Sequence, residues 1–150
     1  MVFAEAGAVQ GDEATSRAML AKYAGSYDPD ALLKEPAVRA ELQKLLGAQM
    51  NHLERNLNVK GAVDLIGQTL SISGNAPHQG TEEEAVVCVA PFNMTVEAAI
   101  LSKGAVTVFT RTEKYEAATL CIKDWITLAN SGHTDRLQQP ANVSMAKPPL

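Results

Sequence analysis

Apolar and polar residues alternate with the period of a β-strand in the middle of the chain. Within residues 69–73, Leu70 and Ile72 alternate with small hydroxyl-bearing residues, which is the pattern of a strand with one buried face. Residues 85–89 (Ala-Val-Val-Cys-Val) are all apolar, and most are β-branched. Such a run predicts a central strand that is buried on both faces.

Three further strand patterns are connected to these two by short turns. Residues 59–66 form the first of them, and Gly67 predicts a hairpin turn between this strand and the next. Residues 96–101 and 105–110 flank a second hairpin turn, which contains Gly104. Five sequential strands with short connections predict an antiparallel meander.

The first third of the chain has helical patterns. One helix is predicted to begin with Asp12 as its N-cap and to end before Gly25. Asp30 is expected to cap a short second helix, which Pro36 ends or restarts. The clearest helical stripe then crosses Gly47, which predicts two helices or one helix with a weak joint. Its apolar residues are Val38, Leu42, Leu45, Leu46, Met50, Leu53 and Leu57.

A last helix is predicted from Thr112, its expected N-cap, to Leu128. Its apolar face consists of Tyr115, Ala118, Cys121, Ile122, Trp125 and Leu128. The sequence therefore predicts an α+β fold, in which a five-stranded antiparallel meander sheet is flanked by N-terminal helices and by one C-terminal helix. Residues 12–150 should form a single domain with a loose tail from about residue 131.

Residues 1–11 are rich in Ala and Gly and are expected to be disordered or to be the remnant of an export signal. Their A-x-A spacings are typical of the end of a cleaved signal. The charged and apolar regions that precede a cleavage site are missing, however, so a cytosolic start is the alternative.

The chain of 150 residues has a formal net charge of −4. Nucleic-acid binding needs clustered Lys and Arg, and these residues are scattered here, so no nucleic-acid partner is expected and a basic partner is favoured. No apolar run approaches the roughly 18 residues needed to span a bilayer, so membrane insertion is not expected.

The segment 74–80 (Gly-Asn-Ala-Pro-His-Gln-Gly) has the composition of a tight loop between two strands. Pro77 fixes its own φ and should stiffen the turn that presents His78, the one unusual polar side chain of the loop. We therefore predict a partner-binding loop that consists of Asn75, Ala76, Pro77, His78, Gln79 and Gly80.

The chemistry of an enzyme has little support in the sequence. The three glutamates at 82–84 are interpreted as solvated residues at the start of a strand, whose charges discourage pairing of the sheet edge with another strand. As an acid–base pair, only Glu82 and Glu84 could converge, because neighbouring strand residues point to opposite faces. His52 is interpreted as a surface or half-buried helical residue, because no metal-ligand motif surrounds it. We predict a binding protein that has no catalytic residue, metal site or cofactor.

The two cysteines allow two interpretations. Cys88 lies in the predicted central strand and Cys121 on the apolar face of the last helix, so both are expected to be buried. They act as small free hydrophobes, or they form a disulfide if the helix packs over the sheet at the required distance. A catalytic thiol is not expected in such apolar surroundings.

The loop and the strands around it resemble the inhibitor of vertebrate lysozyme (Ivy) family. The resemblance covers residues 70–101 and rests on Pro77 and His78, in a loop that Gly74 and Gly80 keep tight. It implies a bacterial protein of the periplasm, with the cytoplasm as the alternative, whose loop places its His among the catalytic carboxylates of a C-type lysozyme. The family's loop is closed by two cysteines that this chain lacks there, so the loop is expected to be less rigid.

Two hypotheses of function follow. The first is inhibition of a basic C-type lysozyme by loop insertion, with the negative charge of the protein speeding encounter. The second is a non-inhibitory binding or immunity-type module on the same fold, with a different protein partner. A monomer and a homodimer are both compatible with either hypothesis.

Overall fold

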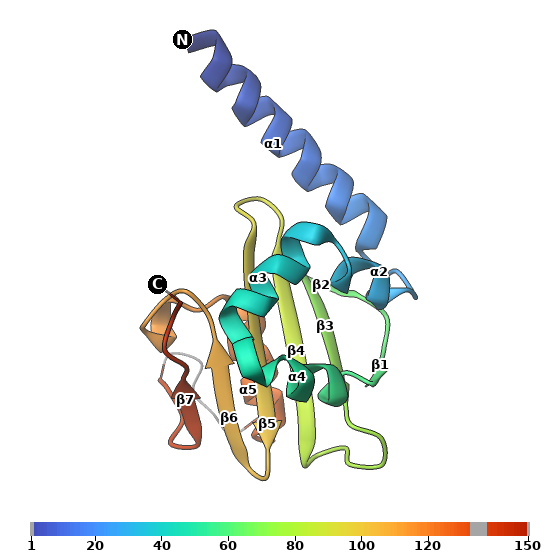
Figure 1. Ribbon diagram of the computed structural model, residues 1–150, viewed down its shortest axis with the longest axis vertical. Coiled ribbons are helices and arrows are strands. Elements are labelled where there is room, and N and C mark those ends of the chain that lie inside the picture. Colours follow the sequence, from blue (N-terminus) through green and yellow to red (C-terminus); the bar gives the residue numbers. More distant parts are fainter. Residues whose placement is uncertain (1, 133–137, 150) are drawn as a thin grey trace.

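The protein has an α+β architecture, as the sequence predicts. The computed structural model describes residues 2–132 and 138–149 (Figure 1). A single sheet has helices on both faces, with α3 and α4 over one face and α5 over the other. The helices are α1 (Val2–Tyr23), α2 (Pro29–Leu33), α3 (Pro36–Leu46), α4 (Met50–Asn56) and α5 (Leu120–Ala129), with short 3-10 helices η1 (Gly47–Gln49) and η2 (Tyr115–Ala117).

Seven strands form the sheet in the part of the chain that the structure describes, in the order β1-β3-β4-β5-β6-β7, and β2 also pairs with β3. Strands β2 to β6 form the predicted antiparallel meander. The strands are β1 (Val59–Lys60), β2 (Asp64–Ile66), β3 (Thr69–Asn75), β4 (Glu83–Ala90), β5 (Thr95–Ser102), β6 (Ala105–Phe109) and β7 (Val143–Met145).

The predicted first strand is two short strands, β1 and β2, because the chain leaves the ladder between them. There the buried Val63 exchanges backbone hydrogen bonds with the turn after α1: its N–H donates to Ser26 O (2.8 Å), and its carbonyl accepts from Gly25 N (2.8 Å). The predicted hairpin turn at Gly67 is confirmed, since Ile66 pairs with Thr69.

The prediction of five strands, all antiparallel, is wrong at one edge of the sheet. Strand β7 lies in the predicted loose tail and pairs in parallel with β6, with Val143 opposite Val106. Val143 is buried against the α5 side of the sheet, and this long-range contact is what orders the short strand. Residues 133–137 of the predicted tail lie outside the described residues.

Strand β4 is the buried central strand that the sequence predicts. Ala85, Val87 and Val89 pack on the face covered by α3 and α4, whereas Val86 and Cys88 pack on the α5 face. Because successive side chains point to opposite faces, burial on both faces explains why the run is continuously apolar.

The N-terminal helices differ from the prediction mainly at their ends. Helix α1 begins at Val2, before the predicted N-cap. Its C-terminal end packs on the core through Tyr23, and its N-terminal part extends away from the rest of the molecule (Figure 1). Asp28, not Asp30, caps α2: its Oδ1 accepts the Ala31 N–H (3.3 Å). Pro36 restarts the helix as α3, and the predicted joint is confirmed at Gly47, whose φ of 52° ends α3. That residues 1–11 are disordered or an export remnant stays a prediction.

Helix α5 begins at Leu120, so the predicted start at Thr112 is wrong. The reason is Glu97 of β5, which is only 1% exposed. Its carboxylate accepts the backbone N–H of Thr119 (3.0 Å) and the hydroxyl of Thr110 (2.7 Å). A buried acceptor from a distant strand therefore fixes the chain just before the helix.

Two residues of the predicted apolar face of α5 have opposite environments. Trp125 is buried as predicted, whereas Leu128 is 77% exposed. Cys88 and Cys121 form a disulfide between β4 and α5, with their Cα atoms 6.2 Å apart. Of the two interpretations that the sequence allows, the structure therefore has the disulfide.

Candidate functional site

The predicted partner-binding loop connects β3 to β4 at one end of the sheet, at the bottom of the view in Figure 1. We refer to residues 75–82 as the β3–β4 loop. Its first residue, Asn75, still belongs to the ladder and pairs with Glu84, so the loop is the closed end of a long hairpin.

Backbone hydrogen bonds hold this loop together. Ala76 N–H donates to Glu83 O (2.9 Å), Gln79 N–H to Ala76 O (3.1 Å), and Glu82 and Glu83 N–H both to Gln79 O (3.1 and 2.9 Å). Asn75 Nδ2 also donates to Ala76 O (2.8 Å). The loop therefore has a defined conformation without a covalent closure of its own.

The tip of the loop is the turn that contains Pro77 and His78. His78 has a φ of +62°, and a proline followed by a residue with positive φ is the pattern of a type II turn. Positive φ is uncommon outside glycine, although His adopts it more often than most residues. Thr81 also has a positive φ, +76°, which is rarer still for a β-branched residue. Strained conformations of this kind gather at binding sites.

The six predicted loop residues do not share one environment. Pro77, His78, Gln79 and Gly80 are exposed, whereas Asn75 is half-buried and Ala76 is buried. The exposed four could contact a partner directly. Asn75 and Ala76 instead hold the turn through hydrogen bonds to the backbone. The binding role of all six residues stays a prediction.

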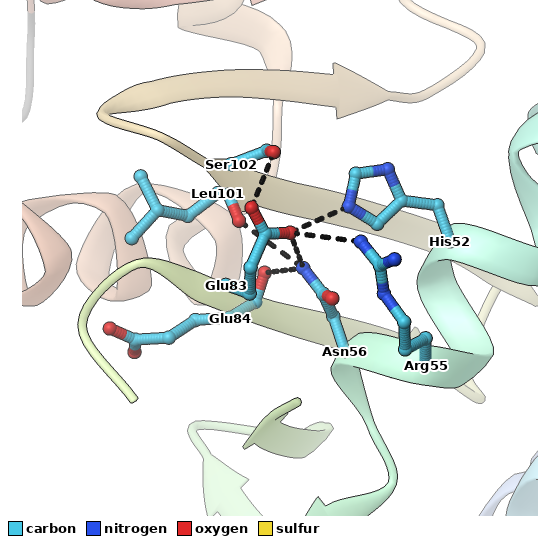
Figure 2. Close-up of polar contacts among 7 residues, drawn as sticks. All are labelled: His52, Arg55, Asn56, Glu83, Glu84, Leu101 and Ser102. Carbon is cyan, nitrogen blue, oxygen red and sulfur yellow. Dashed lines mark hydrogen bonds and ion pairs between the residues drawn. The ribbon is translucent and has the colours of Figure 1, made fainter. Parts of the chain in front are cut away.

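A buried carboxylate, Glu83, lies at the base of the loop, where β4 begins (Figure 2). Its side chain faces α4, and the residue is 5% exposed. Oε1 accepts from His52 Nε2 (2.8 Å) and Asn56 Nδ2 (3.1 Å), and Arg55 Nη2 lies 3.4 Å away. Oε2 accepts the Ser102 hydroxyl (2.6 Å) from the neighbouring strand. We call Glu83 and its four partners the Glu83 cluster.

Asn56 joins this cluster to the ends of two strands. It is fully buried, and its Nδ2 also lies within hydrogen-bond distance of the carbonyls of Glu84 and Leu101 (both 3.2 Å), as Figure 2 shows. Helix α4, β4 and β5 are thus connected by polar contacts directly beside the β3–β4 loop.

The cluster keeps Glu83 ionised. Burial alone would raise its pKa, but hydrogen bonds from Ser102, His52 and Asn56 outweigh burial and lower the pKa to about 2. A buried charge is tolerated only when it is paired and hydrogen-bonded, and this carboxylate meets both conditions.

This cluster is not predicted from the sequence. The interpretation of the glutamates at 82–84 as solvated is wrong for Glu83, and convergence is expected from the sequence only for Glu82 and Glu84. One signal was present: continuing the alternation of Ala85, Val87 and Val89 backward puts residue 83 on the buried face. The interpretation of His52 as a half-buried helical residue is confirmed.

The cluster contains a Ser, a His and a carboxylate, but not in the order of a hydrolase triad. In such a triad the His lies between the nucleophile and the acid and takes the proton of the nucleophile. Here the carboxylate lies between Ser102 and His52 and binds both. The contacts suit a structural connection between elements.

The described residues form neither a metal-binding cluster nor a membrane-spanning helix. No group of three or more His, Cys, Asp or Glu side chains among them could hold a metal ion. None of the described helices is both long and apolar enough to cross a membrane.

Comparison with known proteins gives one match. A family model described as inhibitor of vertebrate lysozyme (Ivy) matches residues 37–131, which is more than half of the 150 residues. The match runs from α3 to just past α5 and includes the β3–β4 loop and the Glu83 cluster. No curated protein and no solved structure matches the chain significantly.

Proposed function

The chain belongs to the inhibitor of vertebrate lysozyme (Ivy) family, and we propose that it blocks a basic C-type lysozyme by inserting the β3–β4 loop into the active-site cleft. Lysozyme inhibition in general follows from the family, and the resemblance seen in the sequence is confirmed by the match. The target, the insertion mechanism and a periplasmic location are our proposals.

The observation that carries the mechanism is the exposed Pro77 and His78 turn at the end of a hairpin that backbone hydrogen bonds close. Glycosidases such as lysozyme work with two carboxyl groups that flank the scissile bond. An imidazole can donate hydrogen bonds to carboxylates. A preformed turn loses little freedom on binding, which favours affinity.

Blocking a cleft in this way needs no chemistry from the inhibitor, so we propose a binding protein and not an enzyme. The net charge of −4 suits a basic partner, because opposite charges accelerate encounter.

The test is a lysozyme inhibition assay with wild type, His78→Ala and His78→Asn. His78→Ala should weaken inhibition by at least about 2 kcal/mol, roughly thirtyfold. The thermal midpoint should change little, because an exposed loop tip supports no core. His78→Asn is the matched control for the backbone, since Asn also tolerates positive φ. It should lose inhibition to a similar extent because it lacks the imidazole.

Inhibition constants that agree for wild type and both variants would exclude insertion of His78. A wild type that inhibits no C-type lysozyme would favour the second hypothesis, a non-inhibitory or immunity-type module with another partner. The absence of cysteines from the loop is the feature that favours this alternative.

A further inference from the structure

We propose that Glu83 is a positioning residue that orders the β3–β4 loop for partner binding. The proposal concerns how the loop is held, and its link to affinity rests on the proposed function. The loop has no covalent closure, because both cysteines of the chain are used in the bridge between β4 and α5. Its order must therefore come from non-covalent contacts.

The backbone of Glu83 closes the loop. Its N–H donates to Gln79 O (2.9 Å) and its carbonyl accepts from Ala76 N–H (2.9 Å), so the hydrogen bonds of this one residue span the turn that presents His78. Any movement of Glu83 away from its site would loosen both bonds.

The side chain of Glu83 fixes that backbone from the opposite direction. Helix α4 supplies His52 and Asn56, and β5 supplies Ser102, so elements on two sides hold the carboxylate. The next residue back, Glu82, accepts the N–H of Lys103 in the β5–β6 turn (3.0 Å). The outgoing end of the loop is thus attached to the body of the protein at two successive residues.

This attachment explains how two uncommon backbone conformations persist in an exposed loop. The positive φ angles of His78 and Thr81 are maintained only where the surroundings over-determine the conformation. The hydrogen bonds within the loop are few, and solvent competes for them. The buried, charge-assisted contacts of Glu83 are the stronger constraint.

The test measures native-state hydrogen exchange of the amides of Ala76, Glu82 and Glu83 in wild type and in Glu83→Gln. The variant keeps the size of the side chain but removes the charge to which His52 and Ser102 bind. Loss of one hydrogen bond to a charged group predicts exchange at least about tenfold faster at these three amides. Glu83→Gln should also lower global stability, so amides in the centre of β4, which exchange through global unfolding, accelerate with the loss of stability that urea unfolding measures. The three loop amides should instead accelerate through local opening, so their exchange rates should depend little on urea.

Glu97→Gln is the matched control, because Glu97 is also a buried strand carboxylate with a threonine hydroxyl and a backbone N–H as donors. It packs on the α5 face, near the other end of β5. This control should leave exchange in the loop unchanged even where it lowers global stability.

A second variant, Ser102→Ala, keeps the proposal testable if Glu83→Gln does not fold. It removes a single donor at the partly exposed edge of the cluster, and it should accelerate the same amides to a smaller extent. Unchanged loop exchange in the folded variants would overturn the proposal, as would loop amides whose exchange in the variants depends on urea as steeply as exchange in the centre of β4 does.

Covalent closure of the loop distinguishes a positioning role of Glu83 from a general contribution to stability, because it can replace only the former. A Cβ atom at Gly80 would lie 3.9 Å from Asn75 Cγ, so residue 80 lies beside the side chain of residue 75, and we choose Asn75→Cys with Gly80→Cys as the pair to close the loop covalently. Added to Glu83→Gln, the oxidised pair should restore loop protection and the affinity for lysozyme, whereas Asn75→Ser with Gly80→Ser should not. Failure of the oxidised pair to restore loop protection would count against positioning.

The exchange measurement needs no partner. A wild type that does not bind lysozyme would therefore contradict the proposed function, while the exchange results would still decide whether Glu83 positions the loop.

Discussion

Replacing Glu83 with Gln should change how the stability of the protein depends on pH. The cluster lowers the pKa of Glu83 from 4.5 to about 2, so the folded state binds its proton less readily than the unfolded state does. A group with a depressed folded pKa stabilises the protein fully above its unfolded pKa. That contribution is lost progressively as the pH falls from about 4.5 toward 2.

The size of the effect follows from the shift. One pKa unit corresponds to about 1.4 kcal/mol, so ionised Glu83 contributes on the order of 3 kcal/mol to the free energy of unfolding at neutral pH. The residue is 5% exposed, so solvent screens the interaction little. This contribution is a large fraction of the total stability of a small domain.

The assay is urea unfolding of wild type and Glu83→Gln at about pH 6 and about pH 2, with Glu82→Gln as the control. Between these pH values wild type should lose about 3 kcal/mol more stability than Glu83→Gln, because only wild type has this carboxylate to protonate. The Glu82 side chain is exposed, so its variant should behave as wild type does. Equal pH dependence for wild type and Glu83→Gln would refute the reasoning.

Two further predictions concern the disulfide and the approach to the partner. Removing the bridge with Cys88→Ser and Cys121→Ser, which lie 33 residues apart in the sequence, should lower the free energy of unfolding by about 4 kcal/mol, measured by urea titration. A loss of less than about 1 kcal/mol would contradict it. The association rate with a basic lysozyme, measured by stopped flow, should fall clearly as salt is raised to about 0.15 M, where charges are screened beyond about 8 Å, while the dissociation rate changes less. An association rate independent of salt would remove steering by charge.

The features that the sequence determined by itself are those with a local cause. The apolar run at 85–89 set the central strand, because a short run of β-branched apolar residues favours a buried strand whatever its partner strands are. Pro36 and Gly47 set the limits of α3, because they restrict or extend the φ angles of single residues. The loop containing Pro77 and His78 was recognisable for the same reason, and it was enough to suggest the family.

The tertiary structure decided the features that depend on contacts between distant residues. Glu83 looks like one member of an acidic run, and the approach of Asn56, 27 residues earlier, and of Ser102, 19 residues later, makes it a buried anchor. Glu97 moves the start of α5 from Thr112 to Leu120 in the same way, across 22 residues. Strand β7 is ordered by β6, which lies far back in the chain. Local patterns report which face of an element is apolar, whereas the partner of a buried polar group is set by how the elements pack, and that packing is absent from any single stretch of sequence.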